Sequence, residues 1–471
     1  MALFLLLVLI IIEIGFAVYG FSLKAPEQNS KKIWNMKRFV VNGVEMMVYL
    51  IMLFLPEIDF SFRFKGLAIM LVVRILIAGV FFLINRKNTK EKKKIMMVLS
   101  AVFGIFFIGT SIIPAFIFTG YSGRELTGPY KVAQCTAILT DESRMETFEN
   151  DGSFREVPMH FYYPENINEL PKDSLPLVIF SHGAFGYYQS NASTYMELAS
   201  NGYVVVSLDH PYHSFFTKDT SGKMITVNPE FFQNALTIGN SETEEVSESD
   251  VYEITSKWME LREADMNFVI DELEKAGGFK YGGSAGETQK NLPSNWYFDS
   301  KYKDTILSVL DGINYDKIGL MGHSLGGATA VTVGRREDVS AVIDLDGSML
   351  GEETGVKDGM AELNEEPYET PILSVISEIH HEDEVWAKET GYLYSNNYVL
   401  EHASDGYETY FKNTGHMNFT DLPLFSPVLA ANLGTGSVDA GECIDQVNAI
   451  VLQFFDCYLK DAGKFAVQSS Y

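Results

Sequence analysis

The chain has 471 residues and a formal net charge of −26, which is distributed unevenly. Residues 1–119 carry a net charge of +8, so the remaining residues carry −34. The strongly acidic charge of residues 120–471 argues against nucleic-acid binding, which needs a basic face. The chain is also longer than one small domain requires.

The first 119 residues contain four apolar stretches, Ala2–Gly20, Phe39–Leu55, Gly66–Ile84 and Ile95–Thr119. About 20 apolar residues span the hydrocarbon core of a bilayer. The second stretch is the shortest and contains Glu45, so it is the weakest candidate. The sequence predicts a membrane domain over 1–119 with about four transmembrane helices. Cleavage of Ala2–Gly20 as a signal peptide is the alternative, and it would leave three apolar stretches.

The basic residues of this front part set its expected orientation. They gather in segments 21–38 and 85–94, whereas segment 56–65 is balanced. Cytosolic loops carry the excess of Lys and Arg. We therefore expect a multi-pass protein of the cell membrane with both basic segments inside and residues 120–471 outside.

Three ionisable residues lie within the apolar stretches: Glu13, Glu45 and Arg74. Charges inside a bilayer are costly unless they are paired or line a polar path. An ion pair that holds the helices together is favoured here over a proton or solute path.

After Gly120, short β-branched and apolar runs alternate with helical patterns. The predicted strands are Lys131–Leu139, Val157–Tyr163, Leu175–Ser181, Tyr203–Leu208, Lys317–Met321, Ala341–Leu345, Ile372–Ile376 and Glu408–Lys412. The predicted helices are Ser193–Asn201, Val251–Lys275, Leu325–Arg335 and Cys443–Lys460. This order indicates a mostly parallel sheet of about eight strands with helices on both faces.

A long insertion, at about 211–300, separates two of these strands. It contains the acidic run Ser241–Asp250, for which a solvated loop is expected. A lid over the active site is the alternative, because the insertion follows the carboxyl end of a strand.

The sequence GHSLGG at residues 322–327 directly follows the apolar run Lys317–Met321. Glycine two residues before and two residues after Ser324 permits a sharp turn from strand to helix, which exposes the serine hydroxyl above the sheet edge. With about eight strands, this motif is typical of the α/β-hydrolase fold. Ser324 is therefore the candidate nucleophile.

A serine nucleophile needs a base and an acid that orients it, and in this fold the chain order is Ser, acid, His. His416 is the best of the later histidines, which also include His380, His381 and His402, because it follows the last predicted strand. The candidate acids are Asp346 and Asp344 at one strand end, and Glu378 and Asp383 after the next strand. Position alone slightly favours the second pair.

Two backbone amides must stabilise the developing oxyanion. The N–H of Leu325, directly after the serine, is one candidate. The other is the N–H of Ala184 in the segment SHGAFG at 181–186, where Gly183 lets the backbone approach the substrate. His182 is expected to bind its own loop rather than to take part in chemistry.

Several blocks of this sequence resemble the platelet-activating factor acetylhydrolase family, in particular its bacterial members. They are FSHG at 180–183, ELASNGYVVV at 197–206, DHPY at 209–212, GHSLGGAT at 322–329, LD at 345–346, SE at 377–378 and GHMNF at 415–419. The resemblance implies that Asp346, and not Glu378, is the acid and that His416 is the base. It also implies esterase or lipase chemistry on short or oxidised acyl groups of phospholipids. Leu325 departs from the Phe of animal members, and the bundle and insertion lie outside the family pattern.

We therefore predict a membrane-anchored serine carboxylic-ester hydrolase with the triad Ser324, His416 and Asp346. The expected partner is an ester or lipid substrate. No cofactor or metal is predicted, since the three cysteines lack metal-binding spacing. An acyltransferase with the same triad is one alternative. The other is a transport or sensing bundle with a non-catalytic hydrolase-like domain.

Overall fold

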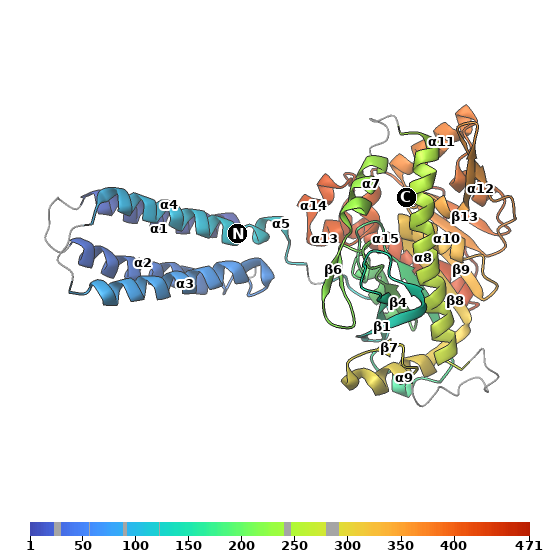
Figure 1. Ribbon diagram of the computed structural model, residues 1–471, viewed down its shortest axis with the longest axis horizontal. Coiled ribbons are helices and arrows are strands. Elements are labelled where there is room, and N and C mark those ends of the chain that lie inside the picture. The colour runs from blue at the N-terminus through green and yellow to red at the C-terminus, as the bar shows by residue number, and fades with distance from the viewer. Residues whose placement is uncertain (23–29, 56, 88–91, 122, 240–245, 279–291) are drawn as a thin grey trace. The chain divides into compact units, whose positions relative to one another are not determined.

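The protein was analysed as a computed structural model, which describes residues 1–471 except 23–29, 56, 88–91, 122, 240–245 and 279–291. It divides into two units, which are described separately (Figure 1). The first consists of Met1–Ser122 with Phe425–Leu429, and the second of Gly123–Leu424 with Ala430–Tyr471.

The first unit is helical. Its helices are α1 (Ala2–Ser22), α2 (Ser30–Met52), α3 (Phe62–Asn85), α4 (Lys94–Ile112) and the single turn α5 (Pro114–Ile117). Helix α1 packs against α4, and α2 packs against α3. Three described stretches are long and apolar enough to cross a membrane: Ala2–Gly20, Phe62–Asn85 and Lys94–Ile112. The weakest predicted span lies in α2, which is outside those three because its first turns are basic.

In this unit, many large apolar side chains are exposed and several charged side chains are buried. Large apolar side chains such as Ile11, Phe81 and Phe103 are exposed, whereas Glu13 and Glu45 are fully buried. Water-soluble helical bundles show the opposite distribution, and lipid-embedded helices turn polar groups inward. The four long helices therefore have surfaces suited to hydrocarbon.

The buried charges of this unit form one ion-pair network. Arg38 Nη1 lies 2.7 Å from both carboxylate oxygens of Glu13, and Arg74 also contacts Glu13. Arg74 Nη1 lies 3.0 Å from Glu45 Oε2. The predicted ion pairing is thus confirmed. Arg38, which the sequence places in the basic segment 21–38, is an additional member.

The second unit contains a sheet of nine strands in the order β13-β12-β9-β8-β3-β4-β2-β1-β7. The strands are β1 (Val132–Met145), β2 (Phe154–Pro164), β3 (Leu175–Ser181), β4 (Val204–Leu208), β7 (Trp296–Tyr297), β8 (Ile313–His323), β9 (Val339–Leu345), β12 (Ile372–Ser377) and β13 (Gly406–Phe411). From β4 to β13 all neighbours are parallel, whereas β7, β1 and β2 form the antiparallel end. All eight predicted strands are present. The ninth, β7, is too short to show a pattern.

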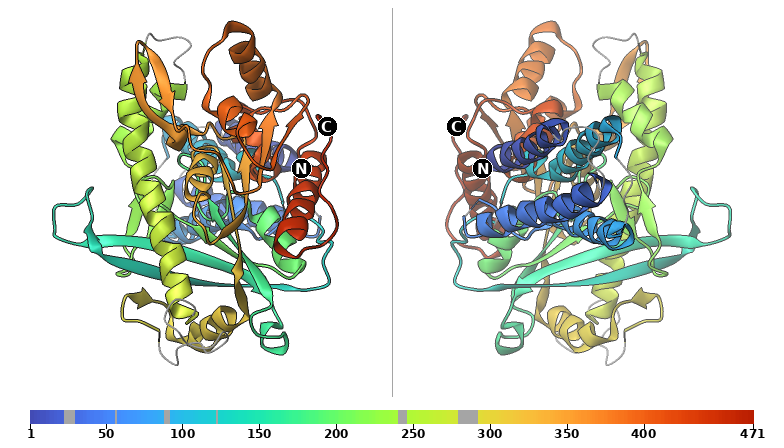
Figure 2. Two further views of the ribbon diagram at one scale, coloured as in Figure 1. Left: turned by 90° about the vertical axis from the view of Figure 1, so that its right-hand side faces the viewer. Right: turned by 90° about the vertical axis from the view of Figure 1, so that its left-hand side faces the viewer.

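Helices cover both faces of this sheet, as predicted. Helices α6 (Ala192–Ser200) and α15 (Ala440–Leu459) pack on one face, where Val178 and Phe180 of β3 point. Helices α8 (Glu248–Ala276), α9 (Lys303–Gly312) and α10 (Leu325–Val333) pack on the other, with Leu177 and Ile179. Figure 2 shows α8 in yellow-green and α15 in red on opposite sides. The two apolar clusters follow from the alternation of side chains along each buried strand.

Short elements connect this framework. They are β5 (Phe216–Lys218), β6 (Met224–Thr226), α7 (Pro229–Gly239), β10 (Glu353–Lys357), β11 (Met360–Leu363), α11 (Glu378–Thr390), α12 (Ser395–Glu401), α13 (Leu422–Phe425), α14 (Pro427–Asn432) and four single 3₁₀ turns at Ile167–Glu169, Ser300–Tyr302, Leu350–Glu352 and His416–Phe419.

The predicted loop Ser241–Asp250 in the insertion is partly wrong. Ser247 caps the N-terminus of α8, so the helix begins at Glu248. Acidic residues are favourable in a first helical turn, where they face the positive end of the helix dipole. Residues 241–245 lie outside the described part of the chain.

Candidate active site

Strand β8 ends in a sharp turn at Ser324, and α10 begins at the next residue. Ser324 has φ 56° and ψ −129°, a conformation that is strained for a residue with a side chain. A Cβ atom at Gly322 would collide with the Gly326 carbonyl, and one at Gly326 would collide with the Ser181 carbonyl. These close approaches explain the glycines of the motif and support the predicted elbow.

The structure brings His416 and Asp346 into contact. His416 begins the 3₁₀ turn after β13, and its Nδ1 lies 2.7 Å from Asp346 Oδ2. Asp346 follows β9 and is buried. The elbow contacts the segments that carry both residues. The Ser324 N–H donates to the carbonyl of Leu345, the residue before Asp346, and the His323 ring lies 4.6 Å from the His416 ring. The segments that carry Ser324, Asp346 and His416 thus meet at the carboxyl edge of the parallel strands.

The rival acids lie elsewhere. Asp344 is fully buried and accepts the Gly347 N–H at 3.0 Å, below the elbow helix. Burial raises its pKa well above the usual range, which favours a neutral carboxyl. Glu378 accepts the Asn413 N–H at 2.9 Å and so binds the loop before His416 instead of the imidazole. Asp383 lies on α11, beyond Glu378.

A second histidine, His380, also contacts Asp346. Its Nδ1 lies 3.3 Å from Asp346 Oδ1, and its Nε2 contacts the Tyr394 hydroxyl. Burial opposes protonation of His380, but the hydrogen bond and the charge of Asp346 raise its pKa to about 9. Burial likewise opposes the charge of Asp346, yet His380 and His416 hold its pKa well below the ordinary value. Sequence reasoning missed this pairing. The available signal was the position of His380 just after the strand beside β9.

The candidate oxyanion loop, 181–186, lies directly against the elbow. A Cβ atom at Gly183 would come within 3.1 Å of Ser324 Cβ, so only glycine permits this approach. Among the described residues, no acceptor takes the Ala184 N–H. Leu325 is the first residue of α10, where an N–H has no helical partner. His182 binds its own loop, as predicted, with Nδ1 2.7 Å from Gly183 O, and its Nε2 lies 2.8 Å from Ser214 Oγ in the segment after β4.

A buried polar network behind this loop was not foreseen. Arg262 of α8 is fully buried and donates to the carbonyls of His182 and Gly183. Burial lowers its pKa to about 9. His210 bridges Ser181 Oγ at 2.9 Å and Asp265 Oδ2 at 3.0 Å. This network fixes the carbonyl groups of His182 and Gly183 in the loop.

Apolar side chains of the insertion form a wall beside the elbow. Phe231 of α7 and Met259 of α8 pack with Leu325 and Ala328. Partly buried members of the same cluster are Ala184, Phe185, Val227, Trp258 and Leu350. The insertion therefore supplies apolar surface to the region of both candidate oxyanion donors.

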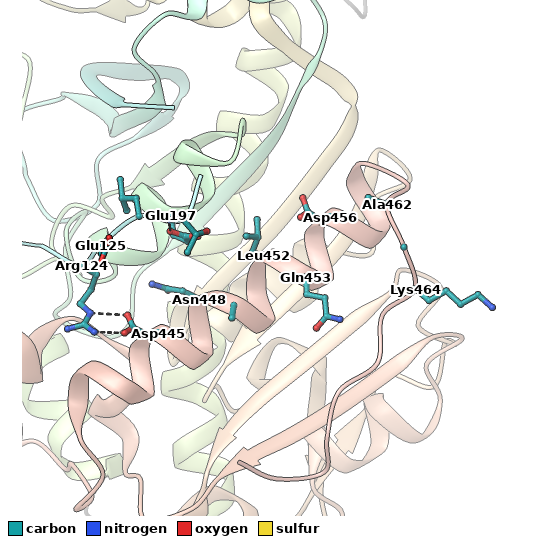
Figure 3. Close-up of a pocket in the computed structure, with 14 residues that line it drawn as sticks. Arg124, Glu125, Glu197, Asp445, Asn448, Leu452, Gln453, Asp456, Ala462 and Lys464 are labelled. Carbon is teal, nitrogen blue, oxygen red and sulfur yellow. Dashed lines mark hydrogen bonds and ion pairs between the residues drawn. The ribbon is translucent and has the colours of Figure 1, made fainter. Parts of the chain in front are cut away.

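A cavity of about 830 Å³ lies elsewhere in this unit (Figure 3). It is lined by residues 124–127, Glu197 of α6, several residues of α15 and residues 462–464. Arg124 pairs with Asp445 at its rim. None of its lining residues comes from the elbow or from the loops of Asp346 and His416, so the cavity is separate from the candidate active site.

Comparisons with known proteins agree with the blocks seen in the sequence. The family profile "Platelet-activating factor acetylhydrolase, isoform II" matches residues 156–468. A platelet-activating factor acetylhydrolase from Gallus gallus is 23% identical over 296 residues, 61% of this chain and 63% of the relative. One from Canis lupus familiaris is 25% identical over 163 residues, 34% of this chain and 32% of the relative. The chain thus spans less than two thirds of either relative.

Among solved structures, a ferulic acid esterase from Streptomyces cinnamoneus matches with a TM-score of 0.49 and 20% identity, covering 73% of this chain and 95% of that one. The family profile extends over about two thirds of the chain and includes the strands before Ser324, Asp346 and His416. The chain therefore belongs to the platelet-activating factor acetylhydrolase, isoform II, family.

Proposed function

We propose that this protein is a serine ester hydrolase whose triad is Ser324, His416 and Asp346. The observation that carries the proposal is the strained elbow at Ser324 together with the His416–Asp346 hydrogen bond. Asp346 orients the imidazole by accepting its Nδ1–H, which leaves Nε2 as the proton acceptor. A buried carboxylate with a lowered pKa remains ionised and suits this task.

In the proposed reaction, Ser324 Oγ attacks the ester carbonyl carbon while His416 takes the hydroxyl proton. The N–H groups of Leu325 and Ala184 stabilise the oxyanion. The bond to the alcohol breaks as His416 returns the proton to the leaving oxygen. Water then attacks the acyl-enzyme, with His416 again acting as the base, and the acid is released.

The substrate class that fits the site best is an ester with an apolar acyl group. The wall of Phe231, Met259 and Leu325 offers such a group an apolar surface beside the elbow. On the same insertion, Phe232 and Leu236 of α7 are exposed. Exposed apolar side chains near a hydrolytic site favour contact with aggregated lipid, and the two relatives are named platelet-activating factor acetylhydrolase.

We further propose that residues 1–119 anchor the enzyme as a multi-pass membrane domain and that residues 120–471 form an extracytoplasmic hydrolase domain with an insertion or lid at about 211–300. The apolar exterior and buried charges of the bundle support the anchor. The basic segments 21–38 and 85–94 support the orientation. An enzyme anchored in this way meets esters that reside in the outer lipid leaflet.

A fluorophosphonate probe tests the nucleophile. It is expected to label the wild-type chain and Ser404→Ala, which changes an exposed serine before β13, but not Ser324→Ala. Equal labelling of the wild type and Ser324→Ala would refute the assignment. A panel of esters graded by acyl length, offered in solution and in vesicles, then tests the substrate class. Preference for soluble short esters would argue against a phospholipid.

A further inference from the structure

Three side chains of metal-ligating types, one of them buried and two half-buried, lie together between α11 and β13. His381 and Glu384 are three residues apart on α11, so they share one face of the helix. Glu408 extends from β13 beneath it. One ligand atom from each of the three residues lies within 4.8 Å of the other two. An ion placed among these atoms would be within reach of all three.

Glu384 is the residue that needs a partner. It is 1% exposed, and neither of its carboxylate oxygens has a hydrogen-bond partner in the described structure. Nδ1 of His381 is also buried without a partner. A buried carboxylate that has neither a donor nor a cation beside it is costly. Without a cation, the carboxyl groups of Glu384 and Glu408 can lie together only by sharing a proton.

The neighbouring charges do not supply the missing donor. The groups that act on Glu384 are the Glu408 carboxyl, the His380 imidazole and the Lys388 ammonium. Glu408 adds repulsion, His380 is engaged with Asp346 and Tyr394, and Lys388 is exposed on the outer turn of α11. The His381 ring is held flat against Tyr410, with ring centroids 3.9 Å apart. Stacking fixes the imidazole in place, as a ligand requires.

We propose that His381, Glu384 and Glu408 bind a divalent transition-metal ion, with Zn²⁺ as the best fit. One imidazole nitrogen and two carboxylates suit Zn²⁺, Mn²⁺ or Co²⁺, whereas Ca²⁺ and Mg²⁺ prefer oxygen ligands alone. Three protein ligands leave one position of a tetrahedral site for water. The ion neutralises two adjacent carboxylates that otherwise repel each other. The sequence did not indicate this site, because Glu408 is distant from the other two residues along the chain.

The ion would fasten α11 to β13 at the edge of the sheet. His380, the neighbour of His381, contacts Asp346 from the first turn of the same helix. A metal clip at this point therefore holds the helix that supports the candidate acid, without touching the substrate. The proposal does not depend on the assigned triad, since its ligands and its test are separate from Ser324.

Metal binding to the full-length protein tests the proposal. The protein, purified in detergent without a polyhistidine tag and freed of metal with a chelator, is titrated with Zn²⁺ and with Co²⁺. We expect one high-affinity Zn²⁺ ion per chain, ligand-field absorption of bound Co²⁺ in the visible range, and a rise in the thermal midpoint on Zn²⁺ addition. Glu384→Gln is expected to weaken binding by at least about tenfold and to abolish the rise.

Two further variants keep the result decisive. Glu382→Gln changes an exposed glutamate on the same helix and should bind Zn²⁺ as the wild type does. If Glu384→Gln fails to fold, Glu408→Gln, at a half-buried position, replaces it. Equal binding by the wild type and the Glu384 or Glu408 variant overturns the proposal. The proposal is also overturned if the wild type binds no ion and Glu384→Gln is more stable than the wild type. That result would mean that the carboxyl groups of Glu384 and Glu408 share a proton instead of binding an ion.

Discussion

His380 contacts the one carboxylate oxygen of Asp346 that His416 does not, with Nδ1 at 3.3 Å from Oδ1. The Ser377 N–H donates to the same Oδ1. Both carboxylate oxygens of Asp346 are therefore engaged. Rotation of the carboxylate would break its contacts to Ser377 of β12 and His380 of α11. The imidazole of His416 takes its orientation from a carboxylate that is itself fixed.

This relationship predicts that His380 positions the acid. His380→Phe removes the donor and is expected to lower kcat about tenfold with little change in KM, because substrate binding does not involve this side chain. His380→Gln retains a donor and should recover part of the loss. Steady-state kinetics on a soluble ester measures both variants. An unchanged kcat in His380→Phe would show that Ser377 N–H alone is sufficient.

The choice between the candidate acids is tested by Asp346→Asn and Glu378→Gln. The amide introduced by Asp346→Asn would bind Nδ1 of His416 in the wrong tautomer, so kcat is expected to fall by about 10⁴, the loss seen when a triad aspartate is changed in this way. Glu378 contacts only the backbone of Asn413, so Glu378→Gln should stay within about threefold of the wild type. Steady-state kinetics on the same soluble ester compares the two variants. The reverse ranking would identify Glu378, directly after β12, as the acid.

Gly183 controls the distance between the oxyanion loop and the elbow. In Gly183→Ala the new methyl group would lie 2.8 Å from His323 Nδ1 and 3.1 Å from Ser324 Cβ. The loop must shift, which moves the Ala184 N–H away from the oxyanion, and kcat is expected to fall by about 10² to 10³. Gly355→Ala is the matched control, because its methyl group would meet only the end of the Glu362 side chain. Full activity of Gly183→Ala would contradict the assignment of the Ala184 N–H as an oxyanion donor.

The sequence was sufficient for the elements that carry periodic patterns. Eight of the nine strands and four main helices were predicted, since buried parallel strands read as short runs of Val, Ile and Leu. The elbow was also predictable, because glycine is required on both sides of Ser324 at a fixed spacing. These features depend on local chemistry, which the sequence displays directly.

Features that arise from long-range packing were not predictable. Position slightly favoured Glu378 over Asp346, and only the resemblance to a family reversed that preference. The contact of His380 with Asp346, the support of Gly183 by Arg262, and the meeting of Glu384 with Glu408 all join residues on different elements. No spacing rule reveals them, since they depend on which strands are neighbours in the sheet.

The ion pairs of the bundle predict a strong response to removal of one partner. Glu13 is contacted by Arg38 and by Arg74, so Glu13→Gln leaves two arginines with reduced compensation. Breaking a buried ion pair costs about 3–5 kcal/mol. The expected result is a lower thermal midpoint of the bundle in the detergent-solubilised protein, while ester hydrolysis in solution is retained. A stable Glu13→Gln bundle would indicate that water reaches this network.

Acid should weaken the network behind the oxyanion loop through His210. Burial and the charge of Arg262 lower the pKa of His210 to about 4, against about 6.5 in an unfolded chain. Between these values the unfolded state binds more protons, so the stability that neutral His210 provides at pH 7 is lost as the pH falls from 6.5 to 4. The loss amounts to about 3 kcal/mol at 1.36 kcal/mol per pKa unit. Asp265, whose pKa is far below normal, stays ionised throughout this window.

The measurement compares the wild type with His210→Asn in urea at pH 7 and at pH 4.5, followed by intrinsic tryptophan fluorescence. Comparing two chains cancels the titration of the many other carboxyls. At pH 7 the wild type should be the more stable, because it retains the contacts to Ser181 and Asp265. At pH 4.5 its advantage should shrink by about 2 to 3 kcal/mol. A constant difference would mean that His210 has the same pKa in the folded and unfolded states.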